Sequence, residues 1–245
     1  MAGTGTLINT AAVVGGGIAG NFAGRFFSRA QQDAISMTCG ISVLFIAIAG
    51  AMEGMLQIIS TESDGGAALG SGRSMFIVLC LVAGTVIGEL LRIEDGFERF
   101  GAWLKVKTGN AKDAGFVDAF VTASLTVCVG AMAIVGAIQD GVTGDCSTLA
   151  VKSVLDFIII AVMTSSMGKG CAFSAIPIFL FEGSITLLAS LIAPFMTESA
   201  IRNMSLIGSI LIFCVGVNLV WGKKVRVANM LPAVLIAVLA AFLPA

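Results

Sequence analysis

Two opposite charges lie inside an apolar run of the chain and are the first candidates for chemistry. Lys152 and Asp156 interrupt the segment VKSVLDFIIIAVM, and Asp145 precedes Lys152 by seven residues. Positions four and seven apart share one face of an α-helix, so the three side chains fall on one stripe if the helix begins near Asp145, and the Lys–Asp pair can touch across a turn. Asp156 then lies roughly 14 Å into a membrane helix. Each charge at that depth costs about 3 kcal/mol on insertion scales.

The Lys152–Asp156 pair has two explanations. It could only fix the register of the helix, or it could line a water-filled pathway or an ion site. Replacing a buried ion pair by apolar residues is often neutral or stabilising. Retention for stability alone is therefore the weaker explanation, and we expect the pair to serve a function.

Other polar residues within apolar segments are expected to converge on this pair, because intramembrane polar groups face protein or water. Glu182 lies between Pro177 and Gly183, and this composition predicts a broken helix with free carbonyls there. Carboxylates suit a proton or sodium, so Asp156 and Glu182 are the expected ligands of a coupling ion, while Lys152 could neutralise an anionic group of a solute. Further expected members of the pathway are Asn9, Ser174, Asn218, Gln139 and Asp145.

Two of these assignments have equally good alternatives. Asn218 could instead form a hydrogen bond between helices. The segment GAIQDGVTGD, residues 136–145, contains Gln139, Asp140 and Asp145 and is read as a glycine-rich connection on the outer side. It could form an entrance to the pathway, or it could be an ordinary solvated turn.

The composition predicts a polytopic, all-α membrane protein. Hydrophobic residues make up 57% of the 245 residues, charged residues 12%, and the mean hydropathy is +1.01, which is more apolar surface than one soluble domain can bury. The chain has no histidine and a net charge of −1, so we expect the lipid bilayer and no nucleic acid as a partner. Serine-elbow, intramembrane aspartyl, H-E-x-x-H and Walker motifs are absent, so we expect neither an enzyme nor a cofactor.

Apolar windows of about 20 residues, the length that crosses a bilayer, predict eight transmembrane helices in a single domain over 1–245. The windows are 5–24, 34–57, 74–93, 115–138, 147–168, 171–196, 201–221 and 227–244. Connections on one side would carry eleven basic residues and those on the other only Arg73 and Arg202, so both termini are predicted outside the cytoplasm. The cytoplasmic connection 94–113 has aromatic residues at helical spacing, which predicts a helix at the membrane interface.

Internal similarity predicts two inverted three-helix repeats, 74–168 and 171–245, preceded by a helix pair. CVGAM at 128–132 resembles CVGVN at 214–218, and three helices per unit would give the copies opposite orientations. The alternative is that glycine-rich helices look alike by composition. G-x-x-x-G spacings, such as Gly16 and Gly20, favour close helix packing, within the chain or in a homo-oligomer.

Five segments in order resemble a known family: GTLINTAAVVGGGIAG, CVGAMAIVGAIQDGVTGD, KSVLDF, FSAIPIFLFEGSITLLA and KKVRVANMLPA. The chain resembles the YqgA/YdfK family of bacterial inner-membrane proteins, whose domain has no assigned function. The resemblance implies an inner-membrane location. With the buried charges, it leads us to expect a proton- or sodium-coupled secondary transporter of a small solute. A passive channel and a non-transporting scaffold are the alternatives.

Overall fold

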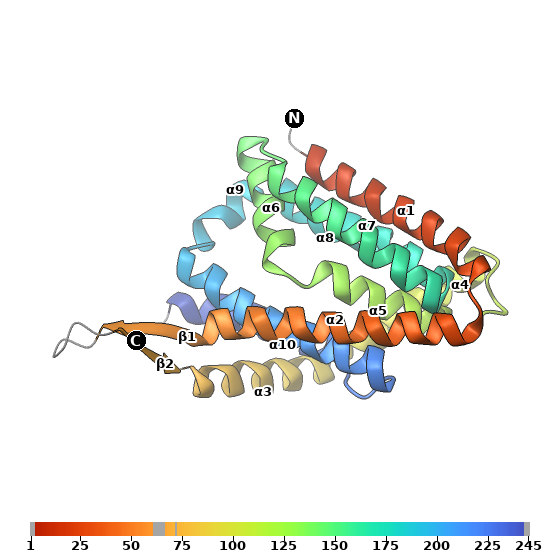
Figure 1. Ribbon diagram of the computed structural model, residues 1–245. Helices are drawn as coiled ribbons and strands as arrows, with labels where there is room; N and C mark the ends of the chain where they lie inside the picture. The colour runs from red at the N-terminus through yellow and green to blue at the C-terminus, as the bar shows by residue number, and fades with distance from the viewer. Residues whose placement is uncertain (1–2, 61–66, 72, 243–245) are drawn as a thin grey trace.

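The computed structural model describes residues 3–60, 67–71 and 73–242 (Figure 1). Long helices dominate this part of the chain, as the composition predicts. The elements are α1 (Thr4–Ala23), η1 (Gly24–Phe26), α2 (Arg29–Met55), β1 (Leu56–Ser60), β2 (Ala67–Ser71), α3 (Ser74–Leu91), α4 (Ile93–Lys107), α5 (Phe116–Cys128), α6 (Ala131–Thr143), α7 (Ser147–Met167), η2 (Lys169–Ser174), α8 (Ala175–Leu187), α9 (Ala189–Ile192), η3 (Ala193–Phe195), α10 (Glu198–Trp221), η4 (Val227–Met230), α11 (Pro232–Leu239) and η5 (Ala240–Phe242).

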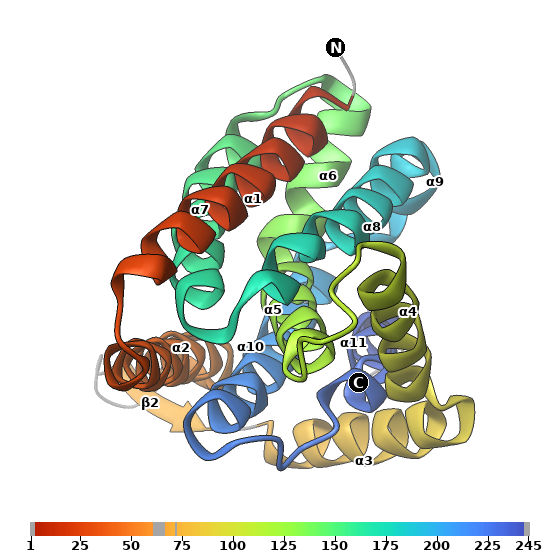
Figure 2. The ribbon, with the colours of Figure 1, turned by 90° about the vertical axis from the view of Figure 1, so that its right-hand side faces the viewer.

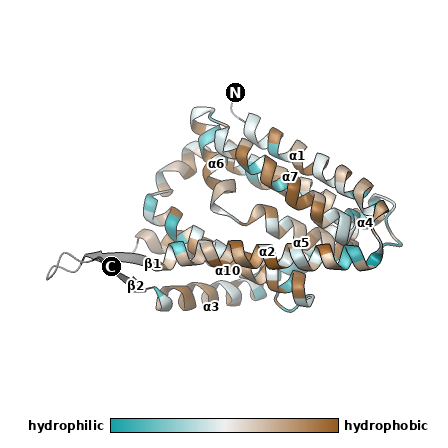
Figure 3. Ribbon diagram, in the orientation of Figure 1, coloured by the Kyte–Doolittle hydropathy of each residue, from teal (hydrophilic) through white to brown (hydrophobic). Residues whose placement is uncertain are grey.

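Several helices are suited to cross a membrane. Five are long and apolar enough, and a sixth span results if the bent pair α5 and α6 counts as one. The five are α2, α3, α7, the segment Lys169–Leu187 and α10. The glycine-rich α1 and the shorter apolar segment Val227–Phe242 occupy the remaining predicted windows, but they are not among these spans. Figure 3 shows apolar residues along much of the long helices, as a multi-pass arrangement requires.

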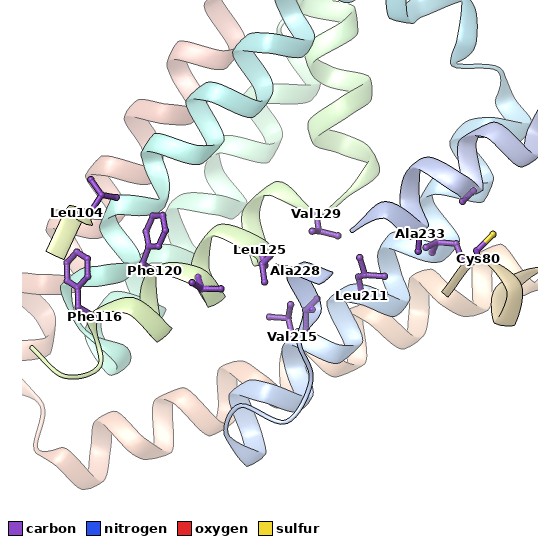
Figure 4. Close-up of a cluster of buried hydrophobic side chains, with 14 residues drawn as sticks. Cys80, Leu104, Phe116, Phe120, Leu125, Val129, Leu211, Val215, Ala228 and Ala233 are labelled. Atoms are coloured by element: carbon purple, nitrogen blue, oxygen red, sulfur yellow. The ribbon is translucent and has the colours of Figure 1, made fainter. Parts of the chain in front are cut away.

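The helices form two groups that meet at α5 and where α2 contacts α7 (Figure 2). In one group α1 packs along α7, and α8 contacts both α1 and α6. In the other group α10 contacts α2 and α11, and α11 contacts α3. Between the groups, buried side chains of α5, including Phe120 and Leu125, join one apolar core with Leu211 and Val215 of α10 (Figure 4).

A two-stranded antiparallel hairpin, which the sequence analysis did not include, follows α2. Strands β1 and β2 pair in register from Leu56 opposite Ser71 to Ser60 opposite Ala67. The hairpin extends away from the helices at one end of the molecule (Figure 1). The predicted helical window 34–57 therefore ends at Met55, where the chain changes to strand.

The helix break expected in α8 lies elsewhere. Helix α8 runs without interruption through Pro177 and Gly183, because Pro177 is its third residue and a proline in the first turn removes no hydrogen bond of the helix interior. The window 171–196 is interrupted after α8, at Leu188, and the window 115–138 is divided as well. Helix α5 ends at Cys128, α6 begins at Ala131, and the two helices are bent by 60° around an extended Gly130.

Side chains from the predicted cytoplasmic connections gather at one end of the molecule. One surface cavity there is lined by Arg25, Asp113 and Lys169, and a neighbouring cavity by Glu94 and Lys223. At the opposite end, the first turn of α1 contacts Asp140 of α6 and Thr186 of α8. The first, third, fifth and seventh connections between the predicted spans thus lie at one end of the molecule, and the fourth lies at the other. Their positions relative to a membrane stay a prediction.

The connection 94–113 contains the expected helix, α4. Leu104 is buried, and Phe100 packs against Phe120 of α5 with ring centroids 5.8 Å apart. Trp103 and Val106 are exposed on the other side. This division between a packed face and an exposed apolar face is what an interfacial helix needs. Its contact with lipid stays a prediction.

The G-x-x-x-G faces are used inside the chain. A Cβ atom added at Gly20 of α1 would lie 2.2 Å from the carbonyl oxygen of Ala161 in α7. At Gly54 of α2 it would meet Leu206 of α10, and at Gly88 of α3 it would lie 1.8 Å from the carbonyl oxygen of Asn229. These faces therefore bring neighbouring helices together and are not free for the expected homo-oligomer, which would need another surface.

Candidate functional site

Four of the predicted residues meet between α1, α7 and α8. The Lys152 ammonium forms an ion pair with Asp156 Oδ2, and its Nζ lies 3.8 Å from Glu182 Oε1. The Asn9 side chain joins the two carboxylates, because its Nδ2 donates to Asp156 Oδ2 at 3.1 Å and to Glu182 Oε1 at 2.8 Å. We refer to Asn9, Lys152, Asp156 and Glu182 as the buried cluster.

The glycines of α1 place Asn9 within reach of α7. Gly16 and Gly20 lie against the backbone of Phe157 and Ala161, where any side chain would collide. The missing Cβ atoms let the two helices approach closely along their whole length (Figure 2). Asn9 lies two turns before Gly16, so the same close contact brings its amide to Asp156.

The helix break supplies the third partner of Lys152. Lys152 Nζ donates to the carbonyl oxygen of Val127 at 2.9 Å. In an uninterrupted helix this carbonyl would accept from the amide of residue 131, but α5 ends at Cys128. The C-terminal end of a helix carries a partial negative charge, which suits an ammonium group. Free carbonyls were thus expected near the site, but from α8 and not from α5.

The buried cluster is closed to solvent. Asn9 and Glu182 are 0% exposed, Asp156 is 5% exposed and Lys152 is 6% exposed. Two of its oxygen atoms, Asn9 Oδ1 and Glu182 Oε2, have no hydrogen-bond partner in the described part of the chain. Burying a polar atom without a partner costs about 1–3 kcal/mol. The cluster is therefore incompletely satisfied by the protein alone.

The charges of the cluster do not balance when every group is ionised. One ammonium faces two carboxylates, so the sum is +1 − 2 = −1. A net charge held away from water is unfavourable unless a further partner compensates it. One bound proton or one monovalent cation would make the cluster neutral.

The other four predicted site residues lie outside the cluster. Asn218 holds the loop after α10, since its Nδ2 donates to the Val225 carbonyl at 2.7 Å and its Oδ1 accepts from the amides of Lys224 and Val225. Gln139 Oε1 accepts from the Thr148 hydroxyl at 2.7 Å. Both residues therefore have local partners of their own. The contacts of Asn218 lie within the loop after its own helix, so they are neither the predicted pathway contacts nor the hydrogen bond between helices offered as the alternative.

Asp145 and Ser174 also depart from expectation. Helix α7 begins at Ser147, so Asp145 is not part of the helical stripe of Lys152 and Asp156. Asp145 is exposed, and the hydrogen bond that it accepts from the Ser147 amide at 2.9 Å lowers the pKa of its carboxyl. Ser174 is fully buried just before α8, and its hydroxyl has no hydrogen-bond partner in the described part of the chain.

Asp140 was assigned only to an outer connection, but it is a buried residue of helix α6. It is 0% exposed and accepts from the amides of Gly5 and Thr6, at 2.9 and 3.4 Å, at the start of α1. The hydroxyls of Thr6 and Thr186 are hydrogen-bonded at 3.1 Å. Thr6 precedes Asn9 by three residues and Thr186 follows Glu182 by four, so these helix faces continue the polar row from the cluster to Asp140. That helical spacing from Asn9 and Glu182 is the signal in the sequence that could have found Thr6 and Thr186.

Comparison with known proteins identifies the family of the chain. The sequence model of a family described as "Protein of unknown function (DUF554)" matches residues 4–242. The chain belongs to this family. It is 25% identical over 232 residues to "Uncharacterized membrane protein YdfK" of Bacillus subtilis (strain 168), covering 95% of this chain and 93% of the relative.

A second relative is "Uncharacterized protein YqgA" of Escherichia coli (strain K12). It is 29% identical over 194 residues, which is 74% of this chain and 83% of the relative. The two relatives confirm the resemblance found in the sequence. No solved structure matches the chain. Together with the apolar helices, the family places this DUF554 protein among multi-pass membrane proteins of unknown function.

Proposed function

We propose that this DUF554 protein is a secondary transporter of the bacterial inner membrane, in which the buried cluster binds the coupling ion. The observation that carries the proposal is a cluster of one ammonium and two carboxylates, closed to solvent, beside a broken helix. Transporters commonly place their ion sites at discontinuous helices near the membrane midplane. The transported solute is small, and an anionic group is the class that Lys152 would accept.

The second carboxylate favours transport over a scaffold. A lock on helix register needs only Lys152 and Asp156, which already form a neutral pair. Glu182 adds a second negative charge that must share the single ammonium of Lys152, and an oxygen without a hydrogen-bond partner among the described residues, at a cost in stability. Such a cost is understandable if Glu182 gains and loses a partner during a functional cycle.

Lys152 favours a proton over sodium as the coupling ion. Its ammonium contacts Asp156 and lies near Glu182, in the place that a bound cation would take between the two carboxylates. Moreover, no group of three or more acidic or cysteine side chains in the described ranges could hold a metal ion. A proton needs no such space. It can bind to one carboxyl oxygen and neutralise the cluster.

The proposal includes eight spans with both termini outside the cytoplasm. Two of the eight proposed spans are not among the long apolar helices: α1 and the segment 227–242. Each packs with the rest of the bundle, since α1 carries Asn9 of the buried cluster and the segment 227–242 packs against α3. It also includes the inverted repeats 74–168 and 171–245. The C-V-G element of the first unit lies at the helix break, whereas Cys214–Gly216 of the second lie inside the continuous α10. Reporter tags at both termini and after Lys107 test the topology, and termini on opposite sides would reject eight spans.

A thermal-stability experiment on purified protein tests the ion site. Melting temperature is measured across pH at fixed sodium, and across sodium at fixed pH and ionic strength, for wild type and Glu182→Gln. The matched control is Glu53→Gln, an exposed residue of α2. A proton site predicts a pH response that Glu182→Gln reduces and Glu53→Gln keeps, with little response to sodium. A sodium response that Glu182→Gln removes would change the coupling ion. Flat responses for all proteins would leave the scaffold explanation.

A further inference from the structure

A polar cavity lies at the end of the molecule where α1 and α7 end and α2 begins (Figure 1). Its volume is about 340 Å³, within the range of about 300–1,000 Å³ that is usual for ligand pockets. Its walls come from the end of α1, the turn η1, the start of α2, the loop before α5, the end of α7 and the first residue of η2. No residue of the buried cluster lines it.

The charges that line this polar cavity favour an anion. Arg25 and Lys169 are exposed, and neither forms an ion pair with a carboxylate in the described ranges. Asp113 is the acidic residue of the lining, so two positive charges face one negative charge. Its Oδ1 already accepts from the amide of Gly115 at 3.1 Å. An anionic group would therefore find two cations that no carboxylate has paired.

The neutral groups of the lining add one further donor. The hydroxyls of Ser165 and Ser166 donate to the carbonyl oxygen of Val162, and Gln32 Nε2 donates to backbone carbonyls. The side-chain amide of Asn21 makes no such bond among the described residues. It can donate to a ligand oxygen, as the guanidinium and ammonium groups can. A phosphate group, with several acceptor oxygens and a negative charge, matches these donors.

An apolar groove lies beside the polar cavity and shares two of its walls. Val14 and Ile18 of α1 line one wall of the groove, Phe173 of η2 lines the other, and the volume is about 310 Å³. Asn21 follows Ile18 by three residues on the same face of α1, which is about 4.5 Å along the helix. Lys169 and Phe173 belong to the same short helix, η2. The site between α1 and η2 is therefore polar at one end and apolar beyond it.

We infer that the polar cavity and the apolar groove together bind one anionic phospholipid, with Arg25 and Lys169 holding its phosphate group and the groove holding an acyl chain. A lipid has a charged group at one end and an apolar chain beyond it, as this site requires. Basic pockets between membrane helices bind lipid head groups in this way. A water-soluble phosphate compound would use the two cations and leave the apolar groove empty. The inference does not depend on ion binding by the buried cluster.

The test is the retention of lipid by the full-length purified protein in detergent. The protein is mixed with equal amounts of phosphatidylglycerol and phosphatidylcholine that have the same acyl chains, and native mass spectrometry counts the lipids that stay bound. Melting temperature is measured in parallel with each lipid and with glycerol 3-phosphate, which has the anionic group without the chains. We expect one phosphatidylglycerol to be retained at least fivefold more strongly than phosphatidylcholine, and a stabilisation that glycerol 3-phosphate does not reproduce.

Variants of both parts of the site decide where the lipid binds. Arg25→Gln and Lys169→Gln, at exposed positions, should each weaken retention of phosphatidylglycerol about fivefold, because each removes a cation near the head group. Ile18→Trp fills the apolar groove and should weaken retention of both lipids. The matched control is Lys107→Gln, an exposed lysine of α4 that lines neither hollow, and it should retain lipid as wild type does. Glu182→Gln should do the same.

Three results would overturn the inference. One is unchanged retention of phosphatidylglycerol when Arg25→Gln and Lys169→Gln are combined. Another is equal retention of the two lipids by wild type, which would show that the cations do not select an anionic head group. The third is an equal rise in melting temperature with glycerol 3-phosphate and with phosphatidylglycerol, which would assign the polar cavity to a free phosphate compound.

Discussion

The buried cluster and the ion pairs of Lys223 with Glu94 and Glu98 have the same composition in different surroundings. Each has one lysine between two carboxylates: Lys152 with Asp156 and Glu182, and Lys223 with Glu94 and Glu98. The side chain of Lys152 is 8% exposed, whereas that of Lys223 is 38% exposed. Water can therefore compensate the carboxylate of Glu98 near Lys223, but not that of Glu182 near Lys152.

The two lysines show what replaces water when a charge is buried. Lys152 has a helix carbonyl, that of Val127, which the break between α5 and α6 makes available. Lys223 needs no such carbonyl, because solvent reaches its ammonium. The helix break thus provides the buried ammonium with an acceptor that solvent provides for Lys223. We therefore expect removal of the two lysines to change the free energy of unfolding by different amounts.

Removal of the two lysines should give the largest difference. Lys152→Met leaves two buried carboxylates without a cation and should destabilise the protein by about 3–5 kcal/mol. Lys223→Met should cost less, because its exposed pair with Glu98 contributes about 0–1 kcal/mol and it leaves one buried carboxylate, that of Glu94, without its cation instead of two. Chemical denaturation in one detergent measures both. Equal losses would mean that the difference in exposure does not determine the energies.

The double replacement Lys152→Met with Asp156→Leu should restore part of the lost stability. It removes the ion pair as a whole, and Glu182 keeps its hydrogen bond from Asn9. An apolar pair in place of a buried ion pair is often tolerated, so the double variant should be more stable than the sum of the single effects predicts. If the cluster serves ion binding, this folded variant should also lose the pH response. A variant that keeps the full response would defeat the assignment of the pair to the site.

Sequence reasoning predicted the helices and the members of the cluster better than the connections. Windows such as 147–168 agree with α7, Ser147–Met167, because the apolar length of a segment largely sets a helix of this kind. Asn9, Lys152, Asp156 and Glu182 could be grouped because isolated buried polar groups must find partners. The sequence did not show which helices pack together to form the cluster, because close packing depends on which glycine lies against which backbone.

The wrong predictions have physical reasons. Pro177 suggested a break, but a proline in the first turn of a helix is harmless. Gly130 gave no comparable signal, although the chain is extended there. Asp140 lies in a glycine-rich polar stretch that resembles a turn, and only its contact with the first turn of α1 shows that it is buried. Those contacts join residues far apart in the chain, which no local pattern reports.

Close helix contacts should matter more around the buried cluster than around the exposed ion pairs. Gly20→Ala would place a methyl group 2.2 Å from the Ala161 carbonyl oxygen, push α1 away from α7 and cost about 1–3 kcal/mol. Gly15→Ala, whose methyl group would lie 3.4 Å from Phe157, is the control on the same helix. Gly96→Ala on α4 meets nothing within 4 Å and should be neutral or slightly stabilising. Melting temperatures measure all three, and similar losses at Gly20 and Gly15 would contradict the close α1–α7 contact.

The smallest expected effect is the alkaline sensitivity of Lys223. Partial burial alone would lower the pKa of its ammonium, but the hydrogen bonds and charges of Glu94 and Glu98 outweigh burial, so the pKa is raised above 10.5. A raised pKa in the folded state means that the stability gained is fully present below the unfolded value and is lost as the pH rises through the folded value.

Wild type should therefore lose stability relative to Lys223→Met above about pH 10.5. The loss should be at most about 1 kcal/mol, because solvent screens an ammonium this exposed. Subtracting the melting curves of Lys223→Met from those of wild type removes the contribution of the other lysines. Glu98→Gln should reduce the difference, since it removes one of the two carboxylates that raise the pKa. A difference that does not change across this pH range would mean that Lys223 is compensated by water alone, and the parallel with Lys152 would then be limited to composition.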